Sequence, residues 1–219
     1  PSTGKEIKYR PFLVKEQKTL LMAQESDNNG EVLDAMSQLI NDCTFSKVNP
    51  KTCPMFDAEY IFLKLRSKSV GEKAEVQVIC KDDNKTKVSV TVNLEDVECN
   101  MTNEHTNVVE ITDTVKIVFG YPLLESFRHV DNKDTTKALF EMIISCIEEI
   151  HYGEDIYNKV DTSKKELTEF IDSLDTNQFK KVSDFFETMP KLRHAVEVIN
   201  PETKVKNEIV IEGLQSFLV

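Results

Sequence analysis

The sequence predicts an α+β fold in which helices pack on antiparallel β-hairpins. Three observations lead to this prediction. Segments in which apolar and polar residues alternate occur in pairs, and a short polar turn separates the two members. Segments with apolar residues at helical spacing precede each pair. The continuous apolar runs that mark the strands of a parallel sheet are absent, so strand–helix–strand units are not expected.

The chain opens with the stretch STGK at residues 2–5, which resembles the end of a phosphate-binding loop. Such a loop needs an earlier glycine, a Ser or Thr after the lysine, and a place between a strand and a helix. Glu6 follows the lysine and no strand precedes it, so a nucleotide site is not expected. Ile7 and Tyr9 then alternate with charged residues, which predicts a short strand ended by Pro11.

Three helices are expected next, because apolar residues recur at helical spacing. In the first helix, Leu20, Leu21 and Met22 are expected to face inward. Asp57 or a neighbouring residue is expected to cap the third helix. The expected ranges are 14–23, 31–42 and 58–65.

From residue 71 the pattern changes to alternation. A hairpin is expected over residues 74–97, because the turn-forming stretch KDDNK separates two alternating segments. A single further strand is expected at 107–122, and a last hairpin begins at Ala195. Between them, helices are expected at 138–150, 163–174 and 176–189, with Thr162 or Ser163 as the cap of the second.

The two hairpin regions follow one plan of strand, polar turn, strand and short apolar tail. This similarity favours a weak internal repeat of two helix-plus-hairpin units, although any two amphipathic hairpins would look alike. On the first interpretation, residues 1–122 hold the N-terminal strand, helices and first hairpin. Residues 123–219 then hold a helical unit and the C-terminal hairpin. One continuous domain is the alternative.

The 219 residues carry a net charge of −11, which argues against nucleic acid and suits docking onto basic protein surfaces. No apolar run approaches the roughly 18 residues that span a bilayer, so no membrane partner is expected. No signal peptide is visible, and because the chain begins with Pro rather than Met, we expect residues ahead of it.

The five cysteines are scattered and form no C-x-x-C pair, which is typical of reduced thiols in a cytoplasm. Cys43 and Cys146 lie on apolar helix faces and are expected in the core. A metal site at Cys80 and Cys99 is the alternative, but the spacing names no further ligands.

Catalytic patterns are not found. The four histidines are isolated, no serine lies in a G-x-S-x-G turn, and no cysteine has the local sequence of a nucleophile. We therefore expect no enzymatic activity, no cofactor and no metal. A hydrolase or metalloenzyme of another class is the competing hypothesis.

Two places are candidates for partner binding. Arg10 and Lys15 flank Phe12, a residue type favoured in interfaces, and Phe217 and Leu218 end the chain with apolar side chains. Because successive strand residues point to opposite faces, we favour the core for Phe12 and the interface for the two cations. The two C-terminal residues would pack on their own hairpin or on a neighbouring protein.

The opening of the chain is similar to that of the baseplate hub assembly proteins of T4-type contractile-tailed bacteriophages. The residues that carry the resemblance are Ser2, Gly4, Lys5, Arg10, Pro11, Phe12, Leu13, Val14, Lys15 and Glu16. Residues 53–72, CPMFDAEYIFLKLRSKSVGE, and the closing Gly213-Leu214 with Phe217 also resemble this family. Some relatives carry cysteine pairs in the hairpins, but this chain has only Cys80 there, so a zinc-ribbon role is not carried over.

The resemblance implies a non-enzymatic phage protein that is made in the bacterial cytoplasm and helps to build the central hub of the tail baseplate. Its partners would be other baseplate hub and tail proteins, and its final place would be the virion. A transient assembly chaperone, absent from the mature virion, is the alternative. On either reading, the STGK stretch is a turn that starts a structural segment.

Overall fold

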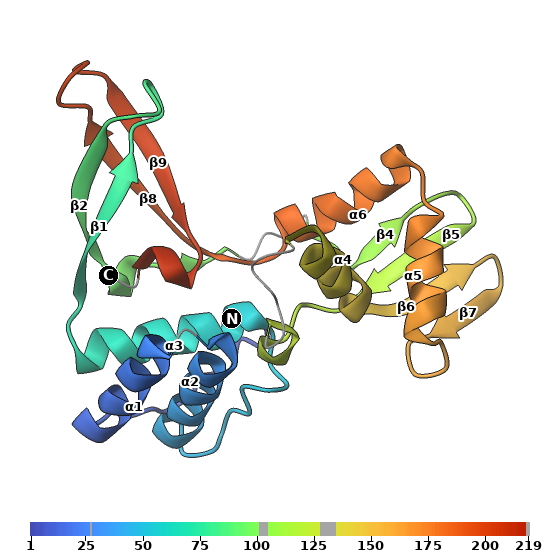
Figure 1. The fold of residues 1–219 in the computed structure, drawn as a ribbon, viewed down its shortest axis with the longest axis horizontal. Helices are drawn as coiled ribbons and strands as arrows, with labels where there is room; N and C mark the ends of the chain where they lie inside the picture. Colours follow the sequence, from blue (N-terminus) through green and yellow to red (C-terminus); the bar gives the residue numbers. More distant parts are fainter. Residues whose placement is uncertain (27, 101–104, 128–134, 218–219) are drawn as a thin grey trace. The chain divides into compact units, whose positions relative to one another are not determined.

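The structure is a computed structural model, and it describes residues 1–26, 28–100, 105–127 and 135–217. The chain divides into two compact units, of which the first joins Pro1–Asn100 to Pro190–Val219 and the second is Met101–Met189. Helices and antiparallel strands occur in both units, which confirms the α+β class (Figure 1). The C-terminal hairpin thus shares a unit with the N-terminal helices. The boundary expected from the sequence, at residue 122, would separate this hairpin from these helices. It remains a prediction about which parts of the chain fold independently.

The first unit combines three α-helices with two long hairpins among its described residues. The three expected helices and both expected hairpins are confirmed. Asn28 caps the second helix, because its side chain accepts a hydrogen bond from the Gly30 N–H. The elements are α1 (Val14–Glu25), α2 (Asn29–Cys43), α3 (Met55–Ser69), β1 (Lys73–Ile79), β2 (Lys87–Asn93), the 3-10 helix η1 (Leu94–Asp96), β3 (Glu98–Cys99), β8 (Leu192–Ile199), β9 (Lys206–Glu212) and the 3-10 helix η3 (Leu214–Phe217).

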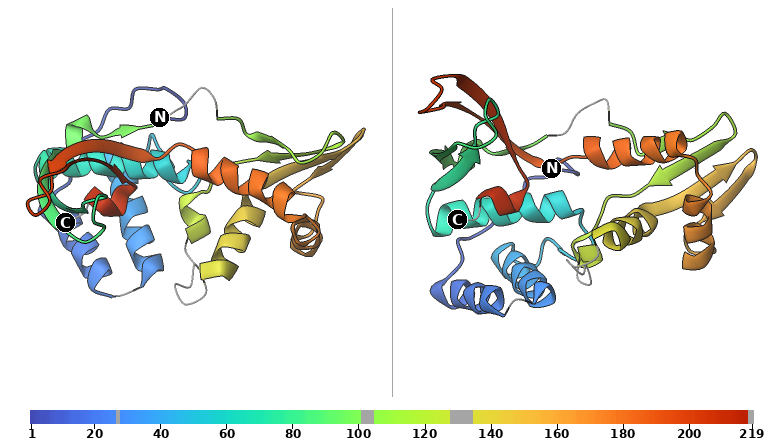
Figure 2. Two further views of the ribbon diagram at one scale, coloured as in Figure 1. Left: turned by 90° about the horizontal axis from the view of Figure 1, so that it is seen from above. Right: turned by 45° about the horizontal axis from the view of Figure 1, so that its top comes forward.

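Helix α1 exposes apolar side chains that were expected to face inward. Ala23 is buried and Leu20 is half-buried, and these two positions, three residues apart, share one helix face. Leu21 and Met22 lie on the other side and are more than half exposed. The expectation for Leu21 and Met22 is therefore wrong, because α1 packs mainly on its neighbour α2 (Figure 2).

Helix α3 is the central helix of the first unit. Phe62 and Leu63 are adjacent in sequence and both buried, so the helix is covered on more than one side. The cap position is Pro54, and Asp57, which was considered for that role, lies in the first helical turn. Its carboxylate is therefore free to bind another segment.

The two hairpins are antiparallel, and a 3-10 helix follows each. Strands β1 and β2 pair from Lys73 opposite Asn93 to Ile79 opposite Lys87, and β8 pairs with β9 in the same manner. The short strand β3 joins the last hairpin by pairing with β8. The two hairpins that suggested a repeat therefore lie in one compact unit and have the same local topology.

The tips of the hairpins have matching backbone geometry. In the first tip, the Asn84 N–H donates to the Cys80 carbonyl at 2.9 Å, and in the second the Lys204 N–H donates to the Asn200 carbonyl at 2.9 Å. Asn84 and Lys204 both have positive φ, at 52° and 64°. Each tip is thus a turn of the same shape closed around a buried residue, Cys80 or Asn200.

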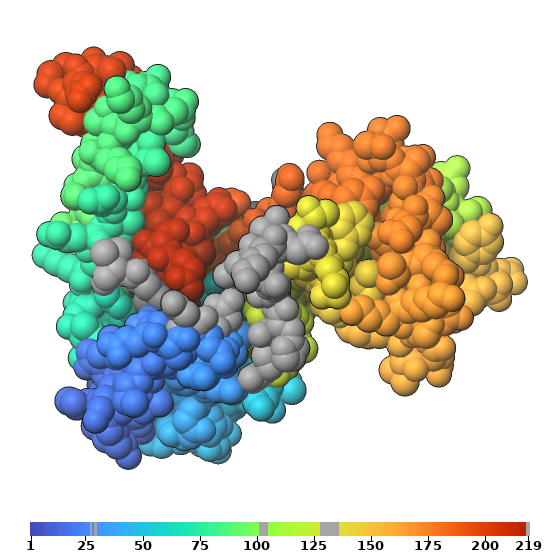
Figure 3. Space-filling model, in the orientation of Figure 1, coloured from blue at the N-terminus to red at the C-terminus, as the bar shows by residue number. Residues whose placement is uncertain are grey.

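A polar network joins the two tips, which lie in contact in Figure 3. Asn207 is its centre, since its amide oxygen accepts from the N–H groups of Lys81 and Asp82 at 2.8 and 3.0 Å. Its amide nitrogen donates to the Asp82 carboxylate at 2.9 Å. Asn200 also donates to that carboxylate, at 3.1 Å. Hydrogen bonding chiefly from Thr203 and Asn200 lowers the pKa of Asp82 and keeps it ionised.

Replacing the central amide should weaken the first unit. We expect Asn207→Ala to lower the free energy of unfolding by about 1–2 kcal/mol, because the buried amide is lost and two partly buried N–H groups and a carboxylate lose their partner. Urea denaturation of the full chain measures this change. Asn41→Ala is the control, since the Asn41 side chain has no hydrogen-bond partner in the described structure and Ala favours a helix. Equal losses in the two variants would contradict the role of the network.

The second unit is a four-stranded antiparallel sheet with helices against one face (Figure 2). Val115, Ile117 and Phe119 point from the sheet into its core, where the Phe119 ring stacks on Phe185 at 4.9 Å between centroids. Ser163 forms a capping box with Glu166, which confirms one of the two expected caps. The elements are β4 (Val108–Glu110), β5 (Val115–Phe119), η2 (Leu124–Phe127), α4 (Thr135–Cys146), β6 (Ile147–Tyr152), β7 (Asp155–Asn158), α5 (Lys164–Asp172) and α6 (Thr176–Thr188).

Two expectations for this unit are wrong. The single strand at 107–122 is a hairpin, because the Thr112 hydroxyl accepts from the Val115 N–H at 3.0 Å and closes a turn between β4 and β5. The helix at 138–150 ends at Cys146, and β6 follows it. The pairing of β6 with β5 skips Glu148, and this bulge allows apolar residues at helical spacing to be buried in a strand.

Candidate functional site

The segment that opens the chain is fixed on helix α3. The Ser2 N–H donates to the Asp57 carboxylate at 2.8 Å, and the Ser2 hydroxyl donates to the other carboxylate oxygen. Gly4 follows in a turn with φ of 61°, a conformation that favours glycine. The STGK stretch is therefore a turn that starts the segment, and its serine binds the aspartate of the FDAEY motif.

The other end of the segment is fixed as well. The Phe12 side chain is buried with 8% exposure, and its N–H donates to the Ser69 hydroxyl at 2.9 Å. Arg10 forms a two-pronged ion pair with Glu16 at 2.7 and 3.0 Å, and its N–H donates to the Cys43 carbonyl. The predicted strand at residues 7–10 is wrong, since these residues belong to no strand and lack a partner strand among the described residues.

The Arg10 pair also orders the start of α1. Glu16 accepts a hydrogen bond from the Leu13 N–H at 2.6 Å, so one carboxylate serves both the ion pair and the helix end. Hydrogen bonding with Arg10 is the main reason that the pKa of Glu16 falls to about 2. The folded-state pKa is lowered, so the ionised pair stabilises the fold above about pH 4.5 and loses this effect as the pH falls toward 2.

The C-terminal segment reaches α3 through Glu59. The Leu214 backbone at the start of η3 lies close to this carboxylate and favours its ionised form, and η3 packs on α3. Burial raises the pKa of Glu59 to about 7, and the Leu214 backbone offsets only part of this rise. Phe217, at the end of η3, is fully buried.

The five candidate partner-binding residues differ in their surroundings. Phe12 and Phe217 are buried, so their side chains pack within this chain. Arg10 is 32% exposed and bound to Glu16, while Lys15 is exposed and has no ion-pair partner in the described structure. Leu218 lies outside the described residues. Partner binding by Arg10 and Lys15 stays a prediction.

Several residues that position the candidate site were missed by sequence reasoning. Ser69 contacts Phe12, and Asp57 contacts Ser2. Glu59 lies beside Leu214. In each case the two residues are far apart along the chain, so no local pattern connects them. Only Glu16 gave a local signal, because a glutamate three residues after a helix start is typical of a capping box. The three stretches that resemble the phage family thus meet on α3.

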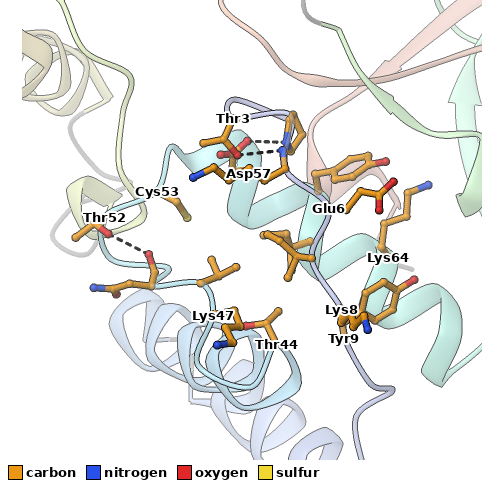
Figure 4. A pocket seen from close by; sticks show the side chains of 17 residues that line it. Thr3, Glu6, Lys8, Tyr9, Thr44, Lys47, Thr52, Cys53, Asp57 and Lys64 are labelled. Carbon is orange, nitrogen blue, oxygen red and sulfur yellow. Dashed lines mark hydrogen bonds and ion pairs between the residues drawn. The ribbon is translucent and has the colours of Figure 1, made fainter.

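A pocket of about 750 Å³ lies between the opening segment, the loop before α3 and α3 itself (Figure 4). Ile7, Tyr9, Val48 and Ile61 supply much of its apolar lining. Its cationic residues are Lys5, Lys8, Lys47 and Lys64. Lys64 donates to the carbonyls of Leu94, Glu95 and Val97, whereas the other three lysines have no ion-pair partner in the described part of the chain.

Two cysteines lie in and near this region. Burial raises the pKa of Cys53, in the pocket wall, and of Cys99 to about 11, which keeps both as neutral, weakly nucleophilic thiols. Among the described residues, no three His, Cys, Asp or Glu side chains are grouped to hold a metal ion. None of the described helices combines the length and apolar character needed to cross a membrane.

Comparison with known proteins identifies the family. The whole chain, residues 1–219, matches the family described as T4 bacteriophage base plate protein. It is also 28% identical over 220 residues to the baseplate hub assembly protein gp26 of Enterobacteria phage T4, which covers 98% of this chain and 93% of that protein. No solved structure matches the chain significantly. The chain belongs to the T4 bacteriophage base plate protein family.

Proposed function

We propose that this protein acts in assembly of the central hub of a phage tail baseplate. The observation that carries the proposal is the near full-length similarity to a T4 protein named for hub assembly. The convergence of the three family-like stretches on α3 supports it, because the residues of the family resemblance are brought together in one region of the first unit. The protein would act without catalysis, through contacts with other hub and tail proteins.

The acidic charge agrees with such a role. A chain with a net charge of −11 is suited to docking on basic protein surfaces and unsuited to binding nucleic acid. We place it in the host cytoplasm during assembly and in the tail baseplate of the virion afterwards.

The test is a phage in which production of this protein is blocked by a nonsense mutation in its gene. We expect wedge assembly to proceed and tails with a complete hub to be lost, because the protein would be needed at the hub alone. Electron microscopy and gradient sedimentation of the lysate measure this, and expression of the wild-type chain from a plasmid is the control. Normal tails in the blocked phage would refute the proposal.

A second measurement separates a resident hub protein from a transient chaperone. Quantitative mass spectrometry of purified virions should find this chain in a fixed ratio to other hub proteins. Its absence from mature virions, together with its recovery on hub intermediates by pull-down, would instead establish the chaperone alternative.

A further inference from the structure

The opening segment has the pattern of a strand, but none of the strands that the structure describes lies beside it. Its apolar residues Ile7 and Tyr9 alternate with Glu6 and Lys8. Within the part of the chain that the structure describes, the backbone N–H and C=O groups of residues 6–9 have no hydrogen-bond partner. Unpaired backbone groups of this kind are the feature that another chain recognises when it adds a strand.

The segment is held in place at both of its ends. Ser2 is bound to Asp57 on α3, and the Arg10 N–H donates to the Cys43 carbonyl at 3.0 Å at the end of α2. Figure 4 shows the chain between these anchors passing α3 without folding back on itself. A partner would therefore meet a segment that is already positioned, which lowers the entropy cost of binding.

The pocket beside the segment can receive side chains of an added strand. Residues 5–9 line the pocket together with the apolar side chains of Val48, Tyr60 and Ile61. An added strand directs alternate side chains to one face, so apolar residues at every second position would enter the pocket. The volume of about 750 Å³ is within the usual range for a binding pocket.

The charges around the pocket select for an acidic partner. Lys5, Lys8 and Lys47 are exposed and lack ion partners in the described structure, although the chain as a whole is acidic. Glu6 is the opposing carboxylate in the same wall, and Asp57 is engaged by Ser2. Positive charge is therefore concentrated here, which favours carboxylate side chains on a partner.

We infer that residues 6–9 are a docking edge at which an extended acidic segment of another protein adds as a β-strand. The apolar side chains of that segment enter the pocket, and its carboxylates bind the three lysines. This inference rests on the proposed function, because it names where and how a hub partner would bind.

The test uses the full ¹⁵N-labelled chain and a short synthetic peptide of alternating glutamate and valine with blocked ends. We expect chemical-shift changes at residues 5–9 and 44–53, and amide exchange at residues 6–9 that slows by about tenfold or more at saturation. The control for strand pairing is a set of two peptides, each methylated on every second backbone nitrogen so that the N–H donors of one peptide edge are removed. The peptide that has lost the donors facing residues 6–9 should bind about tenfold more weakly, because it cannot donate hydrogen bonds to this segment.

Charge is tested with two matched triple variants. The Lys5→Glu, Lys8→Glu, Lys47→Glu variant should weaken peptide binding by about tenfold or more. The second variant reverses Lys18, Lys73 and Lys87, which are exposed, lie in the same unit and are outside the pocket, and it should bind normally. Equal weakening in both variants, or equal binding of a lysine–valine peptide, would refute the acidic partner.

Other outcomes overturn the inference in distinct ways. If saturating peptide does not slow amide exchange at residues 6–9, these residues are not a docking edge. Protection that rises with protein concentration in the absence of peptide would assign the edge to a second copy of this chain. These measurements need no phage assembly, so their failure leaves the proposed function standing, whereas normal tails in the gene-blocked phage refute that function alone.

Discussion

Phe12→Ala is expected to lower the free energy of unfolding by about 3–5 kcal/mol, the usual cost of emptying a buried phenylalanine site. Phe12 is 8% exposed, and its N–H is bound to Ser69 at the end of α3. The substitution leaves a cavity where the opening segment enters the core. Because stability falls by so large a fraction of the total, we also expect the variant to be poorly soluble. Urea denaturation followed by circular dichroism measures the loss.

Arg10→Ala is the contrasting variant. Its ion pair with Glu16 is well formed, but the arginine side chain is 32% exposed, so solvent screens the interaction. We expect a loss of about 1 kcal/mol. Leu13→Ala, at a position that is 54% exposed, is the control for truncation in the same segment and should change stability by about 0.5 kcal/mol or less. A loss in Arg10→Ala as large as that in Phe12→Ala would contradict the division of roles in which Phe12 serves the core and Arg10 serves an interface.

The same variants address partner binding. If the opening segment serves assembly, Arg10→Ala should reduce incorporation into hubs while the purified protein still unfolds cooperatively. Lys15→Ala should act in the same direction, because Lys15 is exposed and has no ion partner in the described structure. Phe12→Ala cannot decide this question, because a protein destabilised in its core would also fail to be incorporated into hubs.

Local signals in the sequence predicted much of the fold. The hairpin at β1 and β2 follows from strict alternation around a polar turn, and the start of α5 follows from Ser163 and Glu166. The same reasoning failed where tertiary pairing overrides a local pattern. Residues 147–150 have helical spacing, but pairing with β5 draws them into a bulged strand.

The candidate site was less predictable, because its key contacts are not local. Ser2 binds a residue 55 positions away, and Phe12 binds one 57 positions away. No periodicity connects such residues, and resemblance to a family could name the segments without showing that they meet. The strand predicted at residues 7–10 is informative in this respect, since its pattern is present but the described residues include no strand that pairs with it.

Glu59→Gln is expected to stabilise the protein at pH 8 and to have little effect at pH 4. The pKa of Glu59 is raised from 4.5 to about 7, chiefly by burial, so the folded state favours the neutral acid. A raised folded-state pKa gives stability that is complete below pH 4.5 and is lost as the pH rises through 7. Glutamine keeps the neutral form at every pH, so the variant avoids the cost of ionising a carboxylate at this buried site. The side chain is only partly buried by surface area, so we expect a gain of about 1–3 kcal/mol.

The measurement is urea denaturation of the parent and the variant between pH 4 and 8. The quantity of interest is the difference between their free energies of unfolding at each pH. Burial lowers the pKa of His105, which gives the opposite pH dependence in an overlapping range, and the difference cancels this contribution. Glu75→Gln is the control, because Glu75 is exposed on β1 and should shift stability by about 0.5 kcal/mol or less at each pH. A difference that is flat across the range, or that is largest at pH 4, would show that the carboxylate of Glu59 is ionised without cost. Glu59 would then lie beside Leu214 as a charged group rather than as a neutral one.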